Sequence, residues 1–67
     1  MSGWNVLVHF LNGEWTVWLG EVNRGNFETQ EKALVFARTL ASRHNSRLWL
    51  QDGRYPPKLV WSPGEDI

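Results

Sequence analysis

The chain has 67 residues, which is the length of one small domain. Hydrophobic residues make up 42% and charged residues 21%, so the composition is that of a globular protein and not of a disordered one. Seven basic residues balance seven acidic ones, and the lack of cysteine excludes a disulfide framework, a thiolate zinc site and a thiol nucleophile.

A β-hairpin centred on Asn12-Gly13 is the first predicted element. Residues 4–10 and 15–19 on either side are rich in β-branched and aromatic side chains. Asn-Gly between such segments favours a two-residue turn, because both residues accept positive φ. This turn pairs Phe10 with Trp15. Alternation then predicts a core face made of Val6, Val8, Phe10, Trp15, Val17 and Leu19.

A loop and then a helix are predicted after the hairpin. Glycine and asparagine recur through residues 20–27, which is typical of a loop. Apolar residues at helical spacing predict a helix over residues 30–44, with Thr29 as its N-cap. Asn45 is suited to end the helix in the left-handed conformation. The helix carries small residues toward the sheet at Ala33, Ala37 and Ala41.

Residues 47–51 (Arg-Leu-Trp-Leu-Gln) predict a third strand. If Leu48 and Leu50 face the core, Trp49 must point to the opposite face. Pro56 and Pro57 interrupt regular structure, because proline cannot donate to a β-ladder.

The expected fold class is therefore α+β. We expect an antiparallel three- to four-stranded sheet with one α-helix packed on one face, in the order β-β-α-β. Residues 58–62 would supply the final short strand if a fourth forms, at an edge of the sheet. Residues 1–62 are predicted to form a single domain, and residues 63–67 a flexible C-terminal tail.

Four segments resemble a known family of short bacterial and phage domains, the uncharacterised domain of unknown function 2188. They are Trp15-x-Val17, Phe27-x-Thr29-x-x-x-Ala33, Ala37-Arg38-x-Leu40-Ala41, and Leu48 to Leu50 before Asp52-Gly53-Arg54. The chain departs from that family at Glu14, where glycine is usual, in its higher tryptophan and lower lysine content, and in the extension from Tyr55 to Ile67. The resemblance implies the fold and transfers no catalytic residue.

Five tryptophans are more than the interior of so small a domain readily holds. Two of them, Trp18 and Trp49, are predicted on the sheet face opposite the helix, where exposed aromatic surface marks a contact with another molecule. The sequence leaves the face of Trp4 and Trp61 undecided, and either Trp61 or Val60 could join this surface. The predicted partner-binding residues are Leu7, His9, Thr16, Trp18 and Trp49.

Three occupants of this face compete. They are a second copy in an isologous homodimer, a heterologous protein, and nucleic-acid bases stacked on the rings with Arg47, Arg54 and Lys58 on the phosphates. A fourth interpretation has the C-terminal segment folding back over the rings. The zero net charge favours a protein partner over nucleic acid. The chain is thus predicted to be a small binding module, and its size and resemblance suggest a phage or accessory factor.

No pattern in the sequence predicts an enzyme, a metal site or a cofactor. His9 and His44 are the only imidazoles, and no cluster at ligand spacing accompanies them. Ser42, His44 and Asp52 lack the motif that frames a catalytic nucleophile. No apolar run approaches the roughly 20 residues of a membrane span. With no cysteine and no leader peptide, we expect a cytoplasmic protein.

Overall fold

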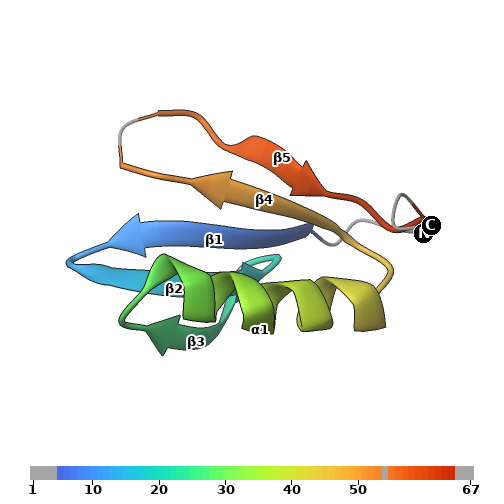
Figure 1. The fold of residues 1–67 in the computed structure, drawn as a ribbon, viewed down its shortest axis with the longest axis horizontal. Coiled ribbons are helices and arrows are strands. Elements are labelled where there is room, and N and C mark those ends of the chain that lie inside the picture. Colours follow the sequence, from blue (N-terminus) through green and yellow to red (C-terminus); the bar gives the residue numbers. More distant parts are fainter. Residues whose placement is uncertain (1–4, 54, 65–67) are drawn as a thin grey trace.

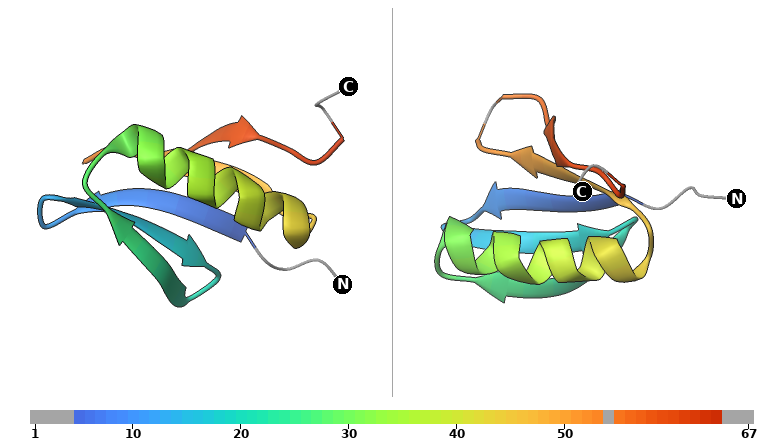
Figure 2. Two further views of the ribbon diagram at one scale, coloured as in Figure 1. Left: turned by 60° about the horizontal axis from the view of Figure 1, so that its bottom comes forward. Right: turned by 45° about the vertical axis from the view of Figure 1, so that its right-hand side comes forward.

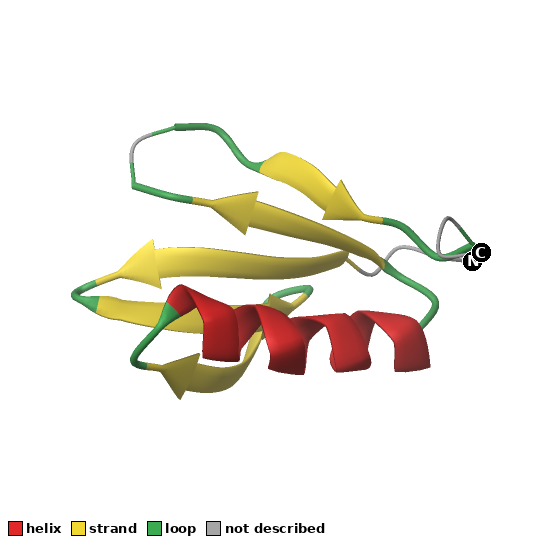
Figure 3. Cartoon of the chain, in the orientation of Figure 1, coloured by secondary structure: helices red, strands yellow, loops and turns green. Residues whose placement is uncertain are grey.

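Five strands form one mixed sheet, and a single helix packs on one of its faces (Figure 1). The computed structural model describes residues 5–53 and 55–64. The strands stand in the order β3-β2-β1-β4-β5, so β1 is central and β3 and β5 form the edges (Figure 3). The elements are β1 (Asn5–Leu11), β2 (Glu14–Leu19), β3 (Val22–Phe27), α1 (Gln30–Arg43), β4 (Arg47–Gln51) and β5 (Lys58–Trp61).

The β1–β2 hairpin has the turn and the register that the sequence predicts. Asn12 and Gly13 form the loop with φ of 55° and 82°, as a turn with two positive φ angles requires. Phe10 stands opposite Trp15, and the antiparallel pairing continues from there to Val6 opposite Leu19.

The predicted loop over residues 20–27 is wrong, because most of it forms strand β3. Gly20, with a φ of 61°, and Glu21 make a two-residue turn that places Val22 opposite Leu19. Glycine at the first loop position is the signature of a type II′ hairpin. The register of β3 on β2 then shifts beside Val17 and Trp18, which marks a bulge. Asparagine and glycine have low strand propensity, so it is pairing with β2 that makes this segment a strand.

The missed strand also explains why a purely antiparallel sheet of three or four strands is a wrong prediction. Each hairpin reverses the chain, so β3 runs in the same direction as β1. Helix α1 then returns the chain across the sheet, and β4 pairs parallel to β1 with Val6 opposite Leu48. Without β3, the same helix would have delivered β4 antiparallel to β1. The fold is α+β, but its sheet is mixed and five-stranded.

Helix α1 begins at the predicted N-cap, Thr29, but its C-cap is His44, one residue before the predicted C-cap Asn45. Thr29 has extended backbone angles, and its hydroxyl accepts a hydrogen bond from the backbone N–H of Lys32 at 3.2 Å. At the other end His44 is the C-cap, and Asn45 follows with a left-handed φ of 54°. No helix in residues 5–53 and 55–64 is long and apolar enough to cross a membrane.

The core lies between α1 and the sheet face toward it (Figure 2). Its fully buried side chains come from small helix residues and strand valines: Val6, Val8, Val17, Ala33, Ala37 and Ala41. Phe10 departs from the prediction, because it is 37% exposed and contacts half-buried Trp15 in a tilted arrangement with ring centroids 4.7 Å apart. The hairpin tip extends beyond the first turn of α1 in Figure 1, so the helix does not cover it.

Strand β5 confirms a final short strand at an edge and decides the face of Trp61. Trp61 stands opposite Leu48, packs against the core, and lies with its ring centroid 5.7 Å from the guanidinium carbon of Arg38. Trp61 therefore lies on the helix side of the sheet. Trp4 and most of the predicted tail lie outside the described residues.

Candidate binding face

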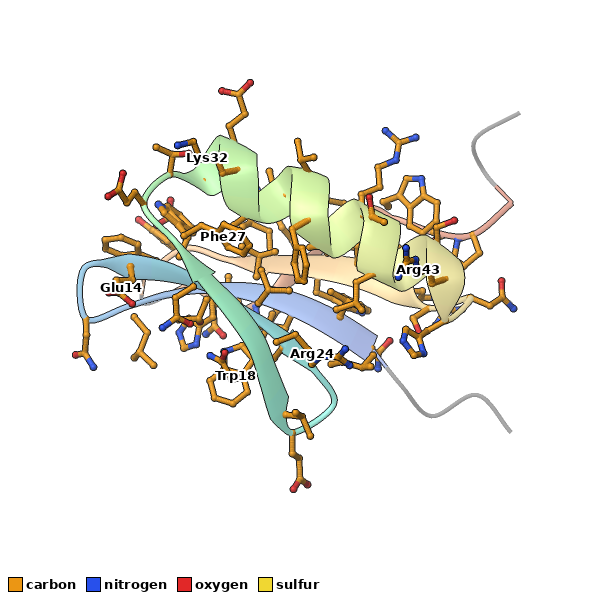
Figure 4. All side chains as sticks on the ribbon, turned by 90° about the horizontal axis from the view of Figure 1, so that it is seen from below. Glu14, Trp18, Arg24, Phe27, Lys32 and Arg43 are labelled. Carbon is orange, nitrogen blue, oxygen red and sulfur yellow. The ribbon has the colours of Figure 1, made fainter. Side chains whose placement is uncertain are left out.

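The sheet face opposite α1 carries one row of side chains centred on Leu7 of the middle strand. Register places Leu7 between Trp18 on β2 and Trp49 on β4. The row continues outward to Asn23 on β3 and Leu59 on β5. Figure 4 shows Trp18 on the side of the sheet away from the helix, whereas Phe27 lies between strand and helix. We call this surface the aromatic face: Leu7, His9, Thr16, Trp18, Trp49 and Leu59.

The side chain of Trp18 points back along β2, so that its indole ring reaches Thr16. Its indole Nε1 donates a hydrogen bond to the Thr16 hydroxyl at 2.8 Å. The same hydroxyl donates to the His9 carbonyl oxygen of the neighbouring strand at 2.7 Å. Thr16 is only 5% exposed although no described element covers this face. The hydroxyl thus fixes the Trp18 ring against the sheet.

Trp49 is also held by its indole nitrogen. Nε1 donates to the Asn5 side-chain oxygen at 3.3 Å, across the parallel pairing of β1 and β4. Both rings, and Leu7 between them, are half-buried. Because each indole N–H has a partner within the chain, the exposed part of each ring is carbon surface. If a partner surface covered these rings, both indole N–H groups would therefore keep their hydrogen bonds.

The row next to the tryptophans is polar. His9 stands opposite Thr16 on one side and beside Gln51 on the other. His9 and Gln51 are half-buried. The five predicted residues therefore do share one face, with Leu7, Trp18 and Trp49 in one row and His9 and Thr16 in the next.

A hollow of about 480 Å³ adjoins the aromatic row. Leu7 and Trp49 line it together with Asn5, the turn residue Gly20, and Pro57 from the segment before β5. Binding pockets commonly have volumes of roughly 300–1,000 Å³ and mostly apolar walls. This hollow has the size to receive one or more side chains of a partner.

The three predicted cations do not converge on this face. Arg47 stands opposite Asn5, so by strand alternation it shares the face with Trp49. Lys58 stands opposite Leu50, which packs against the core, and thus belongs to the helix side. Arg54 lies outside the described residues. At the other end of the face Glu14 stands opposite Leu11.

Sequence reasoning missed Leu59 as a member of this surface and Asn5 as the residue that holds Trp49. Asn5 holds Trp49, and Leu59, which is 44% exposed, completes the row beside it. Trp61 does not join the face. The bulge between β4 and β5 shifts the register beside Trp49, and no local sequence signal specifies that shift. The contact between Asn5 and Trp49 could have been predicted if β1 and β4 had been known to pair in parallel.

The described C-terminal segment does not cover the aromatic face. Up to Gly64 it runs as β5 and a following turn along the edge of the sheet (Figure 1). The interpretation in which this segment folds back over the rings is wrong for the described residues.

A second apolar surface, which the sequence did not indicate, lies between α1 and the edge strand β3. The rings of Phe27 and Phe36 pack there at a tilt of 42° with centroids 5.3 Å apart, and Val35 beside them is 66% exposed. A groove of about 780 Å³ is lined by Phe27, Thr29, Glu31, Lys32, Val35, Phe36 and Thr39. Helical spacing alone predicts that Val35 lies on the outer side of α1, but it puts Phe36 on the buried stripe, whereas Phe36 is 36% exposed.

Ser42, His44 and Asp52 do not come together in the structure. Ser42 and His44 lie at the C-terminal end of α1, whereas Asp52 follows the far end of β4. Among the residues that the structure describes, no group of three or more His, Asp or Glu side chains is placed to hold a metal ion.

Comparison with known proteins finds no matching family model, no similar curated protein and no similar solved structure. The resemblance to domain of unknown function 2188 therefore stays a prediction.

Proposed function

We propose that this chain is a non-catalytic binding module that docks on a protein surface through the aromatic face. The supporting observation is that Trp18 and Trp49 are both half-buried, with part of each ring exposed, while their N–H groups are bonded to Thr16 and Asn5. Aromatic rings fixed in this way contribute apolar area at little cost in side-chain entropy, which is typical of binding hot spots. The hollow over Leu7 offers a place for a partner side chain.

Nucleic acid is a less well supported occupant. Base stacking would use the same rings, but phosphate binding needs several cations beside them. Arg47 is the one described Arg or Lys that the sheet register places on this face, and the net charge of the chain is zero. Titration with single-stranded and duplex oligonucleotides at low salt tests this alternative, for which we expect no binding.

Site-specific photocrosslinking tests the protein-binding proposal. A photoreactive phenylalanine analogue replaces Leu59 on the aromatic face, and in a matched control it replaces Val35, which is 66% exposed on the helix. Each full-length chain is irradiated pure and in extract of its source cells. We expect the photoreactive group at position 59 to form protein adducts, and Trp49→Ala to abolish them. Any adducts from position 35 should be unaffected by Trp49→Ala. Absence of Trp49-dependent adducts from position 59 in both samples would contradict the proposal.

The cytoplasmic location and the phage or accessory role stay predictions. They follow from composition and resemblance, and the aromatic face is compatible with either a homodimer or a heterologous partner.

A further inference from the structure

We infer that the occupant of the aromatic face is a second copy of this chain, related to the first by a two-fold axis that passes at Leu7. This inference rests on the proposed function, because it names the partner of the same face. Three properties of the face support it: the symmetry of its apolar row, the placement of its charges, and its area.

The apolar row is symmetric about the central strand. Leu7 on β1 is flanked by Trp18 on one side and Trp49 on the other, and β1 is the middle strand of the five. An isologous interface must place the same patch against itself. A two-fold axis along this row sets Leu7, Trp18 and Trp49 against their counterparts, so apolar surface meets apolar surface at the centre of the row, and polar Asn23 at its β3 end meets its own counterpart.

The two charges at the ends of the face fix the relative direction of the copies. Arg47 lies one row beyond the tryptophans toward the start of β1, and Glu14 lies two rows away toward its end. A two-fold axis along the row runs the strands of the two copies in opposite directions. The Arg47 end of each copy then lies over the Glu14 end of the other. Because Arg47 is on β4 and Glu14 is on β2, the two side chains lie about two strand spacings (~10 Å) apart across the sheet, so the attraction between these ends is long-range and involves no direct ion pair.

The area of the face matches what a stable dimer needs. The two largest extents of the molecule are 32 and 23 Å. One whole face therefore offers at most about 700 Å² in projection, which is within reach of the ~800 Å² per partner of a standard interface. The dimer must use the complete face, including the polar row of His9 and Gln51. Leu59 then lies within the interface.

Solution mass as a function of concentration tests this inference on the full-length chain. We expect sedimentation to show a monomer–dimer equilibrium with a dissociation constant in the micromolar range or below. Leu7→Glu should weaken it by at least about a hundredfold, since an unpaired buried charge enters the interface twice. Leu59→Glu, at a more exposed position, provides a second variant should Leu7→Glu fail to fold. Val35→Glu on the helix is the matched control and should leave the mass unchanged.

A charge exchange tests the direction of the copies. Arg47→Glu places acid over the Glu14 end of the other copy and should weaken self-association at low ionic strength, by less than the roughly two- to fivefold of a direct exposed ion pair. Adding Glu14→Arg should restore it. Failure of the double variant to recover would overturn the antiparallel arrangement.

The outcomes separate the inference from the proposed function. A mass that stays monomeric up to about millimolar concentration, or a dimer that Leu7→Glu and Leu59→Glu leave intact, overturns the second copy as the occupant. If Trp49-dependent adducts to another protein still form from position 59, the face remains a binding surface with a heterologous partner. If no such adducts form, both the inference and the proposed function fail.

Discussion

The indole nitrogen of Trp18 donates to the hydroxyl of Thr16, two residues earlier on the same strand, at a distance of 2.8 Å. Thr16 in turn donates to the carbonyl oxygen of His9 across the strand pair. One hydroxyl thus joins β1, β2 and an aromatic ring on the face that α1 does not cover. The shape of the aromatic face depends on this side chain.

Replacing Thr16 with valine keeps its shape but removes the shared hydroxyl. Thr16→Val is expected to lower the free energy of unfolding by about 1–2 kcal/mol, because Trp18 Nε1 loses its acceptor and the His9 carbonyl one of its donors. Chemical denaturation measures the change. Thr39→Val is the control, since the Thr39 hydroxyl bonds an exposed helix carbonyl, and it should change stability by less than about 0.5 kcal/mol. Equal effects of the two substitutions would contradict this role.

The stability of the Asn12-Gly13 turn depends on its backbone dihedral angles and not on side-chain packing. Gly13 has a φ of 82°, and a Cβ built on it meets no atom within 4 Å. Gly13→Ala is therefore expected to cost about 1–2 kcal/mol of stability through left-handed strain alone. Asn12→Gly at the neighbouring position should stay within roughly 0.5 kcal/mol of the parent, because glycine also accepts positive φ. Thermal unfolding of both variants checks this, and an unchanged stability of Gly13→Ala would refute the turn assignment.

The close approach of helix and sheet requires small residues on α1. Ala37 is fully buried, so Ala37→Leu forces the helix away from the strand valines and should destabilise the fold by about 1–3 kcal/mol. Val35→Leu, on the exposed side of the same helix, should have an effect below about 0.5 kcal/mol. Urea midpoints of the two variants provide the comparison. A tolerated Ala37→Leu would show that the interface has unfilled space.

The N-cap of α1 is a single side-chain contact. Thr29→Ala removes the acceptor for the Lys32 N–H and is expected to cost about 1 kcal/mol of unfolding free energy. Thr29→Ser keeps the oxygen and should retain most of that stability. Denaturant titration distinguishes them, and similar losses from both substitutions would assign the effect to the lost methyl group instead.

The sequence by itself determined the elements whose signals are local. Asn12-Gly13 specified the first hairpin and its register, because both loop residues tolerate positive φ. Thr29 and the spacing of alanines specified the helix start and its buried side. The hairpin register also placed Trp18 on the face away from the helix, and alternation in residues 47–51 placed Trp49 there, since the faces of a strand are fixed once one residue is known to face the core.

Only the tertiary structure decided the direction of the strands and the membership of the aromatic face. Strand β3 has poor strand propensity and exists through its pairing with β2, and this one additional reversal makes β4 parallel to β1. That parallel pairing, together with the bulge on β5, brings Asn5 and Leu59 to Trp49. These contacts join residues far apart along the chain. They depend on which strands become neighbours, a choice made by packing of the whole sheet and not by any local pattern.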